Sequence, residues 1–136
     1  MGKINLEVVT PAGIITSIEV DSVTAPGTEG EFGILPGHIN FLSGIVPGEL
    51  RYTTGERTDF MAVDSGFAEV SENKVSILVD SAELSTDIDL ERAKSAMERA
   101  KERLAQKRDT EDIDFIRAET ALKKAISRIK VAEKTR

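Results

Sequence analysis

Apolar and polar residues alternate along the first 80 positions of the chain. The pattern is plainest over residues 4–9 and 75–79, where every second residue is Val, Ile or Leu. A period of two places successive side chains on opposite faces of a β-strand, so one face of each segment is expected to be buried. The same alternation predicts further strands over residues 18–20, 23–25, 50–53, 60–63 and 67–70.

Turn residues separate these predicted strands. Proline and glycine occur at Pro11-Ala12-Gly13 and Pro26-Gly27, and polar turns are expected at 54–56, 64–66 and 71–74. Short strands at such spacing are typical of a β-sandwich or flattened barrel rather than of βαβ units. Aromatic residues make up only 4% of the chain, so Val, Ile and Leu are expected to fill the core.

One stretch, Gly30-Glu31-Phe32-Gly33-Ile34-Leu35-Pro36-Gly37-His38, departs from the alternation. Three of the four prolines and six of the ten glycines lie between Pro26 and Gly48. Glycine permits positive φ and close backbone approach, whereas proline fixes φ and donates no hydrogen bond. We therefore expect a run of tight turns on the sheet, with the apolar residues from Phe32 to Leu42 pointing inward.

The composition changes abruptly near residue 86. No glycine follows Gly66 and no proline follows Pro47, while Ala, Glu, Lys and Arg become frequent. These residues are strong helix formers, and Ser85-Thr86-Asp87 offers N-capping side chains. The remainder of the chain is therefore predicted to be helical.

Two parts of this helical region resemble each other. Residues 87–93 (DIDLERA) are echoed 25 positions later by residues 112–118 (DIDFIRA), and apolar residues follow at heptad spacing in both copies. With the polar segment 106–111 between them, these copies predict an antiparallel hairpin of helices over 88–106 and 112–132. The predicted fold is thus α+β, with an N-terminal β-sandwich (flattened barrel) over 1–86 and a C-terminal two-helix hairpin over 87–136.

Alanine occupies every other position of the apolar seam of this hairpin, at Ala93, Ala100, Ala118 and Ala125. Small side chains let the helices approach closely. They also bury little apolar area, which is worth about 25 cal/mol per Å². The hairpin is therefore expected to be weakly packed and able to move.

Composition limits the class of protein. The chain has 136 residues and no cysteine, so it is long enough to bury a core without disulfides. We see no signal peptide and no apolar run of about 20 residues, so membrane association is expected only through a partner. The net charge of −6 divides into −9 over residues 1–86 and +3 over residues 87–136. This division fits either two different partners or two solvated surfaces.

The central stretch carries a resemblance to a known family. GEFGILPGH, followed by Pro47-Gly48, resembles the epsilon subunit of bacterial rotary (F-type) ATP synthases, and the resemblance covers essentially the whole chain. One departure is Asn40-Phe41, where relatives often have a small residue and proline. The departure costs some rigidity of the turn but leaves the frame intact.

The resemblance implies a non-catalytic subunit of the central stalk, located peripherally at the cytoplasmic face of the membrane. The sandwich would couple the gamma subunit to the c-subunit ring during proton-driven ATP synthesis. The hairpin would either fold down or extend toward the alpha and beta subunits and inhibit ATP hydrolysis.

Glu29, Glu31 and His38 lie in or beside the central stretch and resemble positions that face the c ring in relatives. From the residues alone, two acids and the only histidine suggest acid–base chemistry or half of a metal site. Neither is complete, because the chain has no second histidine, no cysteine and no clustered third carboxylate. The remaining interpretations are a partner contact and a surface loop with a hydrogen-bonded histidine.

Ile88-Asp89-Leu90-Glu91-Arg92-Ala93 resembles the I/L-D-x-x-R-A motif of epsilon subunits that bind ATP. In those relatives, cations further along both helices also reach the phosphates, and the corresponding residues here are Arg99, Lys124 and Arg128. The resemblance implies ATP as a regulatory ligand and no obligatory cofactor. The alternative is an ordinary helix start, in which Asp89 lies at the positive end of the helix dipole and pairs with Arg92.

The cations of the hairpin are expected to meet an acidic surface of the catalytic beta subunit; they include Arg99, Arg103, Lys123 and Arg128. Nucleic acid is not an expected partner of the hairpin, because acidic residues interleave with its basic residues. Its one aromatic residue, Phe115, falls on the seam and is not free to stack on a nucleobase. A Gly-rich phosphate loop is absent from the sequence, so nucleotide hydrolysis is not expected. The alternatives are a free-standing ATP sensor and, disfavoured for the reasons above, a small β-sandwich enzyme that uses His38.

Overall fold

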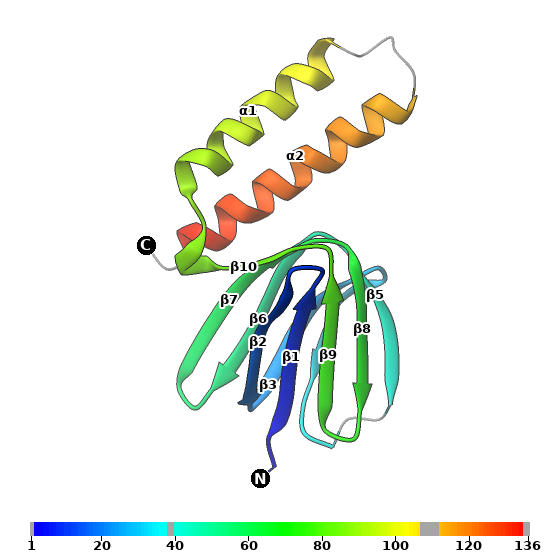
Figure 1. Cartoon of the computed structure of the whole chain (residues 1–136), viewed down its shortest axis with the longest axis vertical. Coiled ribbons are helices and arrows are strands. Elements are labelled where there is room, and N and C mark those ends of the chain that lie inside the picture. The colour runs from blue at the N-terminus through cyan, green and yellow to red at the C-terminus, as the bar shows by residue number, and fades with distance from the viewer. Residues whose placement is uncertain (1, 38–39, 107–111, 135–136) are drawn as a thin grey trace. The chain divides into compact units, whose positions relative to one another are not determined.

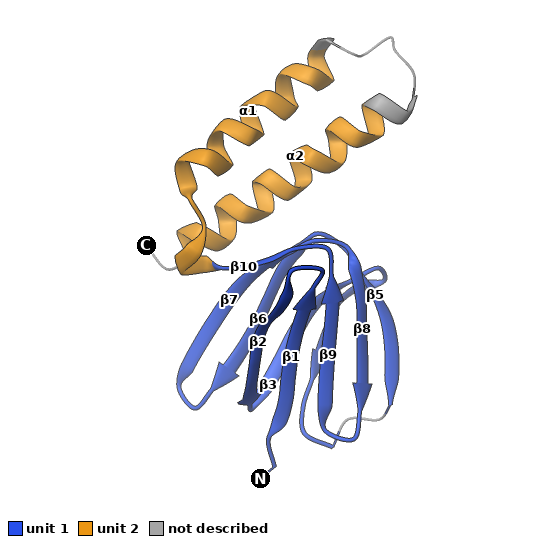
Figure 2. Cartoon of the chain, viewed as in Figure 1, with its two compact units in different colours: residues 1–84 blue, residues 85–136 orange. Residues whose placement is uncertain are grey.

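The computed structural model describes residues 2–37, 40–106 and 112–134, without the side chains of residue 106 and residues 112–114. The chain forms two compact units, Met1–Leu84 and Ser85–Arg136 (Figure 2). The first unit contains the strands and the second contains the helices.

Ten strands form the first unit within the described residues (Figure 1): β1 (Ile4–Thr10), β2 (Gly13–Val20), β3 (Ser22–Gly27), β4 (Gly30–Ile34), β5 (Phe41–Ile45), β6 (Gly48–Thr54), β7 (Arg57–Val63), β8 (Gly66–Ser71), β9 (Lys74–Val79) and β10 (Ala82–Leu84). They pair in the order β10-β7-β6-β3-β5-β8-β9-β1-β2, with β4 beside β3. Strand β1 runs parallel to β9, and the other pairs are antiparallel. The sheet bends into a nearly closed, flattened barrel, which confirms the predicted sandwich.

The core lies between the inner faces of these strands. Buried and half-buried or exposed residues alternate along β1 and β9, as the sequence pattern predicts. Most of the buried side chains are aliphatic, and Tyr52 is their one aromatic member within the described residues. This arrangement agrees with the low aromatic content of the chain.

The sequence pattern is misleading at β2. It predicts that Ile18 shares a buried face with Val20, but Ile18 is 42% exposed while Val20 is fully buried. Strand β2 is the last in the sheet order, and a bulge at Val8/Val9 shifts its register against β1. In the part of the chain that the structure describes, no strand pairs with the free edge of β2, so the inner face is not fully covered there.

The central stretch contains strands, so the prediction of a run of tight turns is wrong in part. Strand β4 forms a hairpin with β3, and β5 begins soon after. Ile34 is buried and Phe32 packs against the core, but Leu35 and Leu42 are 63% and 69% exposed. Strand pairing turns successive side chains to opposite faces, so these apolar residues cannot all point inward.

Two close contacts pack β5 against the β3–β4 hairpin. A Cβ atom at Gly44 would lie 2.7 Å from the Cγ2 atom of Thr28, so a larger residue there would displace the Thr28 side chain in the β3–β4 turn. Phe41, at the departure from the family pattern, sets its ring edge-on to Phe32 with 5.2 Å between the ring centroids. This edge-to-face contact joins the start of β5 to β4.

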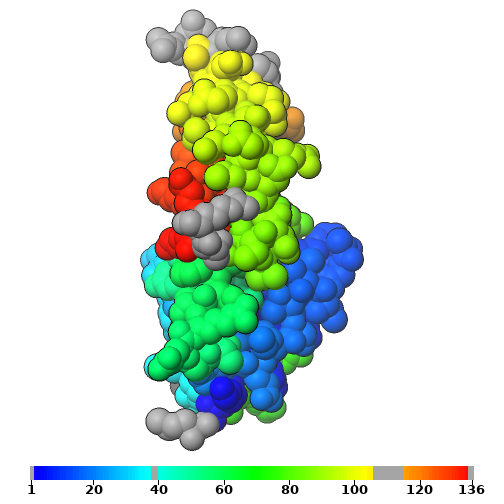
Figure 3. All heavy atoms as spheres, turned by 90° about the vertical axis from the view of Figure 1, so that its left-hand side faces the viewer, coloured from blue at the N-terminus to red at the C-terminus, as the bar shows by residue number. Residues whose placement is uncertain are grey.

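The second unit is the predicted two-helix hairpin. A short 3-10 helix, η1 (Ser85–Asp87), precedes α1 (Leu90–Gln106) and α2 (Asp112–Glu133), which run antiparallel. The space-filling view shows α1 lying over much of α2 (Figure 3). The seam alanines are all buried: Ala93, Ala100, Ala118 and Ala125. Phe115, predicted on the seam, is 38% exposed and lies at its margin.

Within the described residues, we find no helix that is long and apolar enough to cross a membrane.

Candidate functional site

Asp89 caps the first helix. Its Oδ1 atom accepts a hydrogen bond from the main-chain N–H of Arg92 at 3.1 Å, and its carbonyl oxygen accepts one from Ala93 N–H at 3.0 Å. These contacts satisfy N–H groups that a helix leaves unpaired in its first turn. Ser85, Thr86 and Asp87, which the sequence offers as caps, form η1 instead. The carboxylate of Asp89 therefore already has a role in the helix start.

The other members of the ATP-like motif occupy different environments. Ile88 and Ala93 are buried, whereas Arg92 is exposed. Within the described residues, the side chains of Asp89 and Arg92 form no ion pair. Two members of the motif, Ile88 and Ala93, thus contribute to packing, whereas Arg92 lies at the surface.

The remaining cations lie along both helices. Arg99 follows Arg92 by two helical turns, about 10 Å further along α1, and its side chain is exposed. Lys124 and Arg128 are half-buried on α2 and make contacts there. Because α2 returns antiparallel and its end contacts η1, the C-terminal half of α2, which contains these two residues, runs beside the first half of α1. The structure therefore brings Asp89, Arg92 and Arg128 to the end of the hairpin near η1, whereas Lys124 lies near the middle of α2 and Arg99 lies two turns further along α1.

Arg103 and Lys123, predicted as partner contacts, are exposed on α1 and α2. In the antiparallel hairpin Arg103 lies nearer the connection between the helices than Lys123 does. They present charge to solvent in two separate places.

Glu31 is held within the sheet rather than left free. Its carboxylate accepts two hydrogen bonds from the Arg51 guanidinium, at 2.9 and 3.1 Å, and Arg51 also contacts Glu49 at 3.1 Å. These carboxylates raise the pKa of Arg51, the Glu31 hydrogen bonds most strongly, against a smaller opposing effect of burial. Sequence reasoning missed Arg51, because nothing in the sequence places it near Glu31.

Of the other two central-stretch candidates, Glu29 is exposed in the turn between β3 and β4. His38 lies outside the described residues, so the predictions made for it stay untested. Among the described residues we find no group of three His, Cys, Asp or Glu side chains that could hold a metal ion.

Asn73 is a second residue that sequence reasoning misses, because the sequence predicts only a turn at 71–74. Its Oδ1 atom accepts a hydrogen bond from the N–H of Gly37 at 2.7 Å, and its carbonyl oxygen accepts one from Asn5 N–H at 2.9 Å. Asn73 has φ of 61° and Gly37 has φ of 81°, both in the left-handed region. One side chain thus ties the end of the central stretch to the β8–β9 turn. The signal was the asparagine itself, which tolerates this conformation better than most residues.

The outer face of strands β8, β9, β1 and β2 carries a row of apolar residues. Phe67 stands opposite Leu78, Leu78 opposite Val9, and Val9 opposite Ile14. We call Phe67, Leu78, Val9 and Ile14 the apolar row. Phe67 and Ile14 are 61% and 64% exposed. A contiguous exposed apolar row of this kind marks a candidate interaction surface.

Two family models match the chain, one for each unit. "ATP synthase, Delta/Epsilon chain, beta-sandwich domain" matches residues 3–85, and "ATP synthase, Delta/Epsilon chain, long alpha-helix domain" matches residues 86–133. The ATP synthase epsilon chain of Syntrophobacter fumaroxidans is 51% identical over 133 residues, which cover 98% of each chain. That of Nitratidesulfovibrio vulgaris is 50% identical over 110 residues, which cover 81% of this chain and 82% of the relative.

Solved structures show the same fold. A chain of the Euglena gracilis mitochondrial ATP synthase (OSCP/F1/c-ring) matches with a TM-score of 0.80 and 27% identity, covering 93% of this chain and 79% of that one. A chain of the Tetrahymena thermophila mitochondrial ATP synthase central stalk and c ring matches with a TM-score of 0.58 and 17% identity over 98% and 96%. The chain therefore belongs to the family of ATP synthase delta/epsilon chains.

Proposed function

We propose that this chain is the epsilon subunit of an F-type ATP synthase, a non-catalytic part of the central stalk that couples the gamma subunit to the c ring. The observation that carries the proposal is the match to epsilon chains over nearly the whole length, with both units in the same order. The chain then has no reaction of its own, and it meets the membrane only through the complex, at its cytoplasmic face.

The sandwich acts as the mechanical joint. Its support is the exposed apolar row together with a central stretch that Arg51 and Asn73 fasten to the rest of the sheet. A joint that transmits torque needs such fixed attachment, because a loosely held surface would yield under load. In this proposal Glu29, Glu31 and His38 face the c ring.

The hairpin acts as a brake on ATP hydrolysis. Its seam is built from four buried alanines, which contribute little apolar area to the packing of the two helices. A weakly packed unit exchanges between arrangements at small cost, so the hairpin can extend toward the alpha and beta subunits. Its exposed cations, Arg103 and Lys123 among them, then meet acidic residues of the beta subunit.

A truncated chain that ends at Leu84 tests this division of labour. We expect residues 1–84 to fold and to bind gamma and the c ring, because the strands are complete before η1 begins. The reconstituted complex should hydrolyse ATP faster than the complex with the full chain. An unfolded truncated chain, measured by circular dichroism, or unchanged hydrolysis would contradict the proposal.

ATP sensing is a second function of the same hairpin. It is supported by the grouping of Asp89, Arg92 and Arg128 at one end of the unit, with Lys124 one turn before Arg128 on α2, so that cations from both helices can meet phosphates. ATP that binds only the folded-down state stabilises that state by RT ln(1 + [L]/Kd), or roughly 1.4 kcal/mol at a tenfold excess over Kd. The test is calorimetry with millimolar ATP. If it shows no heat of binding and no change in the melting temperature of the chain, the motif serves only to cap the helix.

A further inference from the structure

A second row of side chains lies beside the apolar row on the same outer face. Its members stand opposite one another across five strands: Leu42, Glu69, Ser76, Glu7 and Ser17. We call this set the acidic row. On β8, β9 and β1 it lies two residues along the strand from the apolar row, a separation of about 7 Å. On β2, Ser17 and Ile14 are three residues apart, because the bulge at Val8/Val9 shifts the register. The face therefore presents an apolar stripe and a parallel stripe with two carboxylates.

The two carboxylates of the acidic row lack cationic partners. Neither Glu7 nor Glu69 takes part in an ion pair or side-chain hydrogen bond among the described residues. Elsewhere on the outer surface, two acids of β4 and β6, Glu31 and Glu49, share the Arg51 guanidinium. The described part of the chain thus supplies a cation to Glu31 and Glu49 but none to Glu7 and Glu69.

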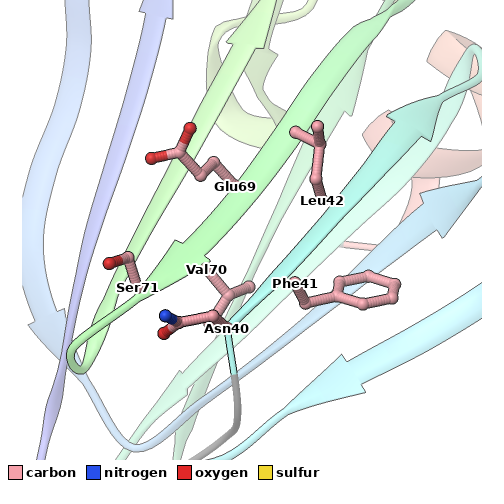
Figure 4. Close-up of a pocket in the computed structure, with 6 residues that line it drawn as sticks. All are labelled: Asn40, Phe41, Leu42, Glu69, Val70 and Ser71. Carbon is pink, nitrogen blue, oxygen red and sulfur yellow. The ribbon is translucent and has the colours of Figure 1, made fainter.

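Glu69 also stands between two hollows. The larger, of about 400 Å³, is lined by Asn40, Phe41, Leu42, Glu69, Val70 and Ser71 (Figure 4). A neighbouring hollow of about 350 Å³ is lined by Asn5, Glu69, Ser71, Glu72, Lys74 and Ser76. The first is shallow and open, and it presents the aliphatic side chain of Leu42, the carboxylate of Glu69 and the hydroxyl of Ser71 side by side.

These features fit one kind of side chain. An arginine has an apolar stem that packs on a surface such as Leu42 and a planar guanidinium that pairs with a carboxylate such as Glu69. We infer that the hollow beside Glu69 receives an arginine of the gamma subunit, while the apolar row is covered by apolar residues of the same partner. This inference rests on the proposed function, which makes gamma the neighbour of the sandwich.

A partner protein fits this surface better than a small molecule does. The hollow opens on the same face as an apolar row whose ends are more than half exposed, and only a macromolecule covers both together. The carboxylates then determine which register of the partner is accepted, because a wrong register buries Glu69 without a cation. Glu7 lies two strands, about 10 Å, from Glu69 and provides a second point of charge recognition.

Binding of purified gamma subunit to the full chain tests the inference, measured by surface plasmon resonance at about 50 and 300 mM NaCl. We expect Glu69→Gln to weaken binding by on the order of fivefold at the lower salt concentration, and by less at the higher one. Leu42→Ser should also weaken binding, but with no dependence on salt. The matched control is Glu56→Gln, which removes one exposed carboxylate from the β6–β7 turn instead.

The possible outcomes separate the inference from the proposed function. If the wild-type chain fails to bind gamma, both are wrong. If the wild type binds and Glu69→Gln and Leu42→Ser bind equally well, with unchanged melting temperatures, only the inference is overturned. Free arginine is the second probe: micromolar binding to the wild-type chain would identify a small-molecule site and overturn the assignment to a partner side chain.

Discussion

Arg51 holds Glu31 across strand β3 by a two-pronged ion pair, with Nη2 donating to Oε1 at 2.9 Å and Nη1 to Oε2 at 3.1 Å. Strands β4 and β6 pair with opposite edges of β3, so this contact joins two strands over a third. The Arg51 side chain is only about one-third exposed. One guanidinium therefore fastens the β3–β4 hairpin to the sheet.

Replacing Arg51 with glutamine should lower the stability of the sandwich. The substitution leaves Glu31 and Glu49 close together with no cation between them, and we expect a loss of about 1 kcal/mol. Urea unfolding followed by circular dichroism measures it, and the loss should shrink as salt screens the repulsion. Arg57→Gln is the control, because Arg57 pairs with Asp59 at the surface and its side chain is 77% exposed. Equal losses in the two variants would show that the two-pronged contact has no special weight.

The Arg51–Glu31 pair illustrates what the sequence leaves undetermined. Alternation of apolar residues identifies strands and their buried faces, because burial acts on each strand separately. It does not say that β3 lies between β4 and β6, and that long-range order decides which charges meet. The same reason explains why Asn73 and the acidic row were not predicted as sites.

Signals that act over a few residues predict the helical part of the chain more completely. The break in composition after the strands, the 25-residue echo and the alanine seam predicted the hairpin, because helix propensity and heptad spacing act over a few turns. Asp89 was considered as a helix start, and it caps α1. The exposed apolar residues Leu35 and Leu42 were misassigned, since hydrophobicity alone does not distinguish a core residue from one on an interaction surface.

Acidification should destabilise the sandwich partly through Asp21. Its carboxylate accepts the N–H of Gly55 at 2.6 Å and pairs with Lys3 at 3.0 Å, and these contacts lower its pKa, the hydrogen bond most strongly. A lowered folded-state pKa means that the stabilisation is present above the unfolded pKa of about 4 and is lost as the pH falls through the folded value. Asp21→Asn should therefore lose less stability than the wild type in urea titrations below about pH 5. A wild-type stability that falls no more steeply than that of the variant would rule out this contribution.

Asn73 should contribute through both its backbone and its side chain. Asn73→Gly keeps the left-handed conformation but removes the acceptor for Gly37 N–H, whereas Asn73→Ala loses both. We expect a cost of about 1 kcal/mol for the lost hydrogen bond and roughly 1 kcal/mol more for alanine at positive φ. Amide hydrogen exchange of Gly37, measured by NMR, should be faster in both variants. Protection of Gly37 that survives in Asn73→Gly would show that the side chain does not hold the central stretch.

Charge on the hairpin should govern its action as a brake. The net charge is −9 over residues 1–86 and +3 over residues 87–136. The same hairpin cations can therefore be attracted either to the acidic residues of the sandwich or to those of a partner subunit. Each exposed pair contributes only about 0–1 kcal/mol. Several together can shift a two-state equilibrium, since about 1.4 kcal/mol is a tenfold change in population. The cations chosen for replacement with alanine are Arg99, Arg103, Lys123 and Arg128.

That fourfold variant should relieve inhibition of ATP hydrolysis in the reconstituted complex while gamma binding by the sandwich survives. The control replaces four other hairpin cations with alanine, which changes the net charge equally: Lys94, Lys101, Lys130 and Lys134. If only the first variant relieves inhibition, the positions of the charges matter. If both relieve it, overall charge suffices. Unchanged inhibition in the first variant would mean that shape and apolar contact make the brake.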